Sequence, residues 1–81
     1  MNVTLGKRMK PPLGYLGSHR DHEVARLTLI AEKTKEGHYN LEYFLQEDIG
    51  KNGHVAASVL GEMVSGIELD FQKKLSQREE N

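Results

Sequence analysis

Four histidines stand out in this chain of 81 residues, which contains no cysteine. His19 and His22 are three residues apart, so on a helix they would share one face, a geometry that can hold a metal ion. A complete site would still need a further histidine or an acid brought in by folding. Surface histidines without a partner are far commoner, and we therefore expect no metal and no cofactor.

The same stretch supplies the residue types of a nucleophilic centre. Ser18 and His19 are neighbours, as are Asp21 and His22, and catalysis of this kind needs a serine beside a histidine that an acid orients. Neighbours in sequence seldom make a working triad, and a chain of this length has little material for a water-excluding pocket. We expect a non-catalytic protein.

Basic side chains gather near the N-terminus. The first 20 residues hold four of the eleven basic residues and none of the twelve acids. A basic arm ahead of an acidic body can lie against phosphates. The candidate contacts for nucleic acid or another anion are Lys7, Arg8, Lys10 and Arg20.

The segment that carries these charges, residues 1–17, is expected to be an extended arm. Pro11 and Pro12 favour extended geometry and exclude a helix through Lys10. If the protein binds another protein, exposed aromatic side chains are the usual anchors, and Tyr15 and Tyr43 are the candidates.

The last third of the chain predicts one long amphipathic helix over residues 53–78, because apolar residues recur there at steps of three and four. A straight helix of 25 residues spans about 37 Å, whereas a globule of this size has a radius of gyration of about 12 Å. We therefore expect a homo-oligomer. Glycine weakens a helix, so a break near Gly66 remains an alternative. The predicted seam between copies is Leu60, Val64, Ile67 and Phe71.

The middle of the chain, residues 18–50, fits two patterns. Helical spacing and capping residues at both ends favour helices over 19–36 and 40–49. Alternation of apolar and polar residues instead favours a β-hairpin over 24–47 packed on the C-terminal helix. We favour the helices, since Ala, Glu, Lys, Leu and Arg dominate residues 23–36. The prediction is a single domain, 1–81, that is mostly α, with an extended arm followed by about three helices; the alternative is an α+β fold.

A resemblance covers about half of the chain. Its elements are the run KPPLG at Lys10–Gly14, the stretch from Asp21 to Arg26, and Glu36-Gly37 leading to Leu41-Glu42-Tyr43. In these runs the chain resembles small uncharacterised bacteriophage-type proteins. The resemblance implies a helix, a glycine turn and a second helix, and it carries no assigned activity.

Two functional hypotheses follow. The first is a small non-catalytic binding or regulatory protein that acts through a protein partner and that the resemblance suggests is phage-encoded. The alternative is a helix-turn-helix DNA-binding regulator between Leu41 and Leu60, assisted by the basic arm. No run of the sequence approaches the 18 apolar residues of a membrane span and no signal peptide is visible, so we expect a cytoplasmic protein without a membrane partner.

Overall fold

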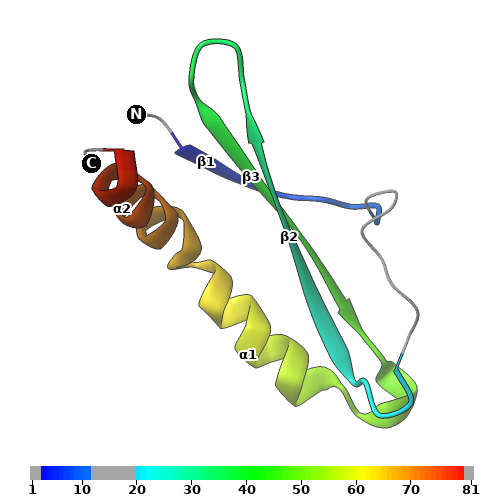
Figure 1. The fold of residues 1–81 in the computed structure, drawn as a ribbon. Helices are drawn as coiled ribbons and strands as arrows, with labels where there is room; N and C mark the ends of the chain where they lie inside the picture. Colours follow the sequence, from blue (N-terminus) through cyan, green and yellow to red (C-terminus); the bar gives the residue numbers. More distant parts are fainter. Residues whose placement is uncertain (1–2, 12–19, 80–81) are drawn as a thin grey trace.

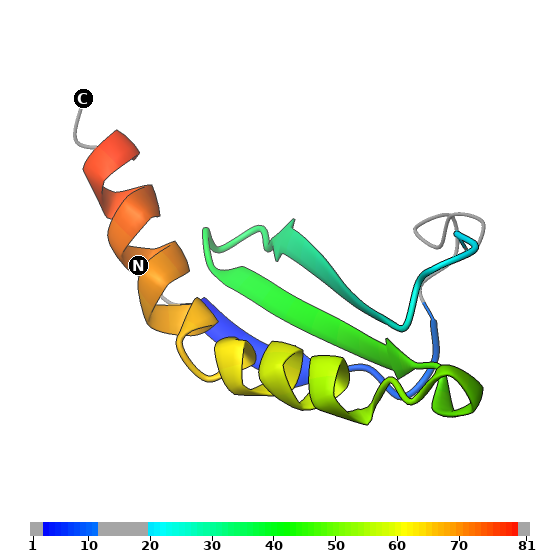
Figure 2. The same ribbon diagram turned by 90° about the horizontal axis from the view of Figure 1, so that it is seen from below.

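A computed structural model describes residues 3–11 and 20–79, which form a three-stranded sheet with two helices on one side (Figures 1 and 2). The protein is elongated, with extents of 45 × 24 × 21 Å and a radius of gyration of 14.6 Å. Its elements in chain order are β1 (Val3–Lys7), β2 (Ala25–Lys33), β3 (Tyr39–Glu47), the short 3₁₀ helix η1 (Ile49–Lys51), α1 (His54–Val64) and α2 (Ile67–Glu79).

β3 is the central strand of the sheet, in the order β1-β3-β2. It pairs antiparallel with β2 as a hairpin and parallel with β1. The hairpin turn is closed by a hydrogen bond from the Thr34 amide to the His38 carbonyl, 2.8 Å long. Gly37 occupies the left-handed region in this turn, with φ of 85°, a conformation that costs glycine little.

The core lies between the sheet and the helices. Leu41 of β3 is aligned with Leu5 on β1 and Ala31 on β2, so these three side chains share the helix-facing side of the sheet. On the same side, Tyr39 meets Phe71 of α2 edge-on, with ring centroids 5.7 Å apart. The buried residues of this layer are Val3, Leu41, Ala57 and Val64.

The prediction of a mostly helical protein is wrong, because β2 and β3 occupy the segments predicted as helices 19–36 and 40–49. The chain adopts the α+β alternative and adds a strand that neither prediction contained. The apparent capping residues serve the sheet instead: Gly37 turns the hairpin, and Asn40 accepts a hydrogen bond from the Thr4 hydroxyl across the sheet, at 2.8 Å. An isolated two-stranded ribbon is marginal, and β1 supplies the missing neighbour.

Two further predictions need correction. Part of the expected arm, Val3–Lys7, is strand β1 of the sheet; residues 12–17 of that arm lie outside the described residues. The long helix is two helices, interrupted at Ser65 and Gly66. There the Glu62 carbonyl accepts hydrogen bonds from both the Ser65 hydroxyl, at 2.8 Å, and the Ser65 amide, at 3.3 Å, which closes the last turn of α1.

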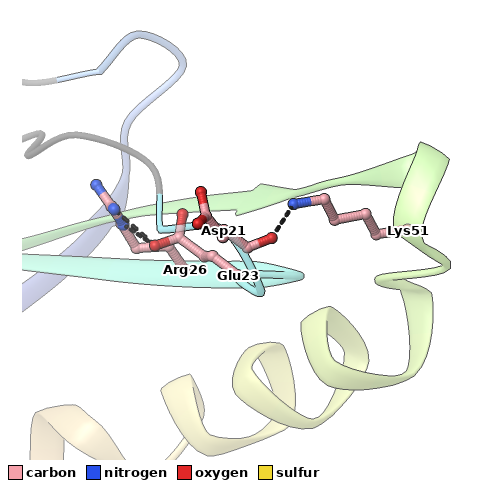
Figure 3. Close-up of polar contacts among 4 residues, drawn as sticks. All are labelled: Asp21, Glu23, Arg26 and Lys51. Atoms are coloured by element: carbon pink, nitrogen blue, oxygen red, sulfur yellow. Dashed lines mark hydrogen bonds and ion pairs between the residues drawn. The ribbon is translucent and has the colours of Figure 1, made fainter.

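The far end of the hairpin is tied to the start of the helical layer. The Asp48 amide donates to the Val24 carbonyl at 2.9 Å, and the Lys51 ammonium donates to the Asp21 carbonyl at 2.6 Å (Figure 3). Gly53 packs into this junction so closely that a Cβ atom there would stand 2.1 Å from the Val24 carbonyl oxygen. No side chain fits at this position.

We therefore predict that Gly53→Ala lowers the free energy of unfolding by about 3 kcal/mol or more, because the backbone of the junction must move apart. Gly6→Ala is the matched control, since a Cβ atom at Gly6 meets nothing within 4 Å. Urea denaturation monitored by circular dichroism measures both variants. Equal stability of the two would contradict the close packing of this junction.

Candidate protein-interaction surface

Helix α1 is apolar on both its sides. Among its eleven residues, HVAASVLGEMV, the only acid is Glu62, and there is no lysine or arginine. Its inner side packs on the sheet, and Ala57 and Val64 are 7% and 5% exposed. Gly61 also lies against the sheet, because a Cβ atom added there would be 3.7 Å from Cδ2 of Leu45. The polar side chains of α1, at His54, Ser58 and Glu62, follow one another at steps of four and form a separate exposed row.

The outer side of α1 carries a row of exposed apolar side chains, which we call the outer ridge. Val55, Val59 and Met63 follow one another at steps of four residues, so they lie along one line on the helix surface. They are 76%, 50% and 60% exposed. Single exposed apolar residues are normal, but an aligned group of them marks a surface suited to a protein partner.

The predicted oligomer seam lies on the opposite side of the helices. Val64 is buried, and Leu60, Ile67 and Phe71 are half-buried. Phe71 is already in contact with Tyr39 of the sheet. Within one chain these four residues pack towards the sheet; their role between copies remains a prediction.

The structure brings three of the four predicted anion contacts together. Lys7, Arg8 and Lys10 line a shallow, open groove of about 580 Å³ along β1 and β3. The Arg8 guanidinium donates to the Glu42 carboxylate at 2.7 Å, so its charge is partly neutralised by the sheet. Arg20 is exposed and does not line this groove.

Other sequence candidates take different positions. Tyr43 is half-buried, aligned with Leu29 on β2 and therefore on the helix-facing side; Tyr15 lies outside the described residues. The predicted helix-turn-helix is not formed, since most of its first helix is strand β3.

The histidines do not gather into a metal site in the described part of the chain. No three histidine, aspartate or glutamate side chains lie close enough there to hold one ion. The imidazole of His54 instead pairs with the Glu47 carboxylate at 3.0 Å. His19 is outside the described residues. Neither described helix has the length and apolar character needed to cross a membrane.

A second apolar surface lies where α2 passes the edge of the sheet. Leu29 of β2 is 47% exposed and borders a groove of about 300 Å³ with the apolar side chains of α2. Two cationic residues stand on its rim: Lys74, which is paired with Asp70 at 2.8 Å, and Arg78. The other apolar lining residues are Ile67, Phe71 and Leu75.

Comparison with known protein families, with characterised proteins and with solved structures finds no significant match for this chain. The interaction surface is therefore inferred from the geometry of the structure alone. The sequence contained its signal, because the spacing of Val55, Val59 and Met63 is visible there. The sequence does not show that this row is left outside, because the period alone does not reveal where the sheet lies or that the helix ends after Val64.

The two sides of α1 give a matched test. We predict that Val64→Ala lowers the free energy of unfolding by about 2 kcal/mol, because it removes buried methyl groups. Val59→Ala should change it by less than about 0.5 kcal/mol, since an exposed valine loses little and alanine favours helix. Both changes are identical in chemistry, and chemical denaturation compares them. A larger loss at Val59 would place the outer ridge inside the monomer core.

Proposed function

We propose that this is a small non-catalytic binding protein that acts by holding another protein against the outer ridge of α1. The observation that carries the proposal is that α1 has a continuous row of apolar side chains on the side that the sheet does not cover. Val55, Val59 and Met63 are left at least half exposed, and burying an apolar side chain of this size is worth about 1.5–3 kcal/mol.

The chemistry of the ridge indicates what kind of partner fits. A straight row of side chains at steps of four packs into the groove between the rows of another helix. Glu62 is exposed beside the ridge and favours a basic residue on the partner. We therefore propose an amphipathic helix of a different protein, apolar along one stripe and basic at its margin. That the protein is phage-encoded and cytoplasmic remains a prediction from the sequence.

A photo-crosslinking amino acid at position 59 tests this proposal in the native cell. We expect one specific adduct with another protein, and no such adduct from the same group at Lys73, which is exposed on α2. Val55→Glu together with Met63→Glu should abolish the adduct at 59, because two charges then interrupt the ridge. Equal labelling from positions 59 and 73, or no adduct at 59, would contradict the proposal. A crosslinked dimer of the protein itself would instead show that the partner on the outer ridge is a second copy of this chain.

A second candidate function is contact with nucleic acid through the groove of β1. The specific observation is that Lys7, Arg8 and Lys10 share this groove. Because no recognition helix is formed at residues 41–49, binding through this groove would be to the phosphates of the nucleic acid and independent of its sequence.

For this candidate we predict that Lys7→Ala with Lys10→Ala weakens binding to duplex DNA and reduces the salt slope of log K by about 2. The control removes two lysines outside the groove, Lys35 and Lys73, both of them exposed. Fluorescence anisotropy with a labelled duplex at several salt concentrations measures both pairs. Equal slopes for the two double variants would dismiss the groove as a phosphate site.

A further inference from the structure

Strand β2 forms an edge of the sheet along all of its nine residues in the described part of the chain. Proteins usually protect such an edge with proline, a bulge or a charge on the inward-facing side. β2 contains no proline, its register with β3 is continuous from Ala25 to Lys33, and its helix-facing residues are apolar until Lys33. Among residues 3–11 and 20–79, no strand covers this edge, and it is open to another strand.

The hydrogen bonds at both ends of the hairpin show which backbone groups face this edge. Val24 accepts from Asp48, and Thr34 donates to His38. Because bonded and non-bonded pairs alternate in an antiparallel ladder, the even-numbered residues of β2 bond to β3. The odd-numbered residues direct their N–H and C=O groups away from the sheet: Ala25, Leu27, Leu29, Ala31 and Lys33.

We propose that the β2 strands of two copies pair antiparallel around a two-fold axis at Leu29, which joins two sheets into one of six strands. In this register each Leu29 lies opposite the partner's Leu29, and each Leu27 lies opposite the partner's Ala31. Ala25 lies opposite the partner's Lys33. All five outward-facing residues of each strand then exchange backbone hydrogen bonds with the other strand.

The charges of β2 select this register. A two-fold axis at Leu29 places Arg26 opposite the partner's Glu32, twice, on the side of the sheet away from the helices. Opposite charges in directly facing positions stabilise a strand pair. An axis at Leu27 would place Arg26 opposite Thr28, and an axis at Ala31 would place Glu32 opposite Ile30.

The Glu23 carboxylate holds the Arg26 side chain in position for this contact. Its guanidinium donates to the Glu23 carboxylate at 2.6 and 3.1 Å (Figure 3), and both side chains are mostly buried, at 21% and 13% exposure. Glu32 is exposed. When two copies of β2 run antiparallel, their opposite charges thus face each other. This points to a second copy of the chain as the partner rather than to a different protein.

The apolar groove beside α2 supports the same contact. Leu29 remains 47% exposed because α2 does not cover it fully, and β2 is the outer strand of the sheet beside β3 (Figure 2). In the pair, the two Leu29 side chains meet on the helix-facing side. This contact uses a different surface from the outer ridge, so it can fail or hold independently of the proposed function.

Single-cysteine variants of the whole chain test the pairing directly, because the natural sequence has no thiol. Facing residues in a bonded antiparallel pair have Cα atoms about 5.5 Å apart, within the range of a disulfide. We expect Leu29→Cys to form an interchain disulfide under mild oxidation and Val59→Cys to stay reduced. Crosslinking at 59 with none at 29 would overturn the proposal and place the contact between copies on the outer ridge.

Two substitutions without cysteine complete the test by analytical ultracentrifugation. Ala31→Pro removes an outward N–H that β3 does not use, so it should preserve the fold and abolish the dimer. Glu32→Lys sets like charges opposite each other and should raise the dimer dissociation constant about tenfold, whereas Glu62→Lys, an equal charge change on α1, should leave it unchanged. A natural protein that stays monomeric up to millimolar concentration, or a dimer unaffected by Glu32→Lys and Ala31→Pro, would refute the pairing.

Discussion

The structure depends on β3, the only strand in the described sheet that is bonded along both edges. Its even-numbered residues bond to β2 and its odd-numbered residues bond to β1, as the hydrogen bond from the Arg8 amide to the Tyr43 carbonyl shows. Leu41 is 5% exposed at the centre of this arrangement. The strands on either side of it, β1 and β2, are both edges of the described sheet.

The sequence predicted the helical character of the last third because its apolar period is long and regular. The middle third could not be decided in the same way, since Ala25, Leu27, Leu29 and Ala31 fit a strand while Val24, Leu27 and Ile30 fit a helix. Tertiary pairing decided between them, and local propensity did not. Strand β1 could not be predicted, because five residues beside a basic, proline-containing stretch are too few to show an alternation of apolar and polar residues. Its parallel partner strand is 36 residues away in the sequence and leaves no local signal.

The candidate surfaces were only partly visible in the sequence, for a related reason. Apolar spacing shows that a helix has a buried side, but it does not say whether a second row of apolar residues is also buried. α1 has such a second row, and only the position of the sheet shows that Val55, Val59 and Met63 are outside. The open edge of β2 likewise required the strand order. In the part of the chain that the structure describes, the apolar row on α1 and the edge of β2 are separate surfaces.

Amide hydrogen exchange measured by NMR tests most directly that β3 is central and that β2 is an open edge. In dilute solution we expect slow exchange at Arg26, Thr28, Ile30 and Glu32, whose amides bond to β3, and fast exchange at Leu27, Leu29 and Ala31. At high concentration the second group should become protected as the edges pair. Uniform protection along β2 in dilute solution, or helical protection through residues 19–36, would contradict an open edge at β2 and a central β3.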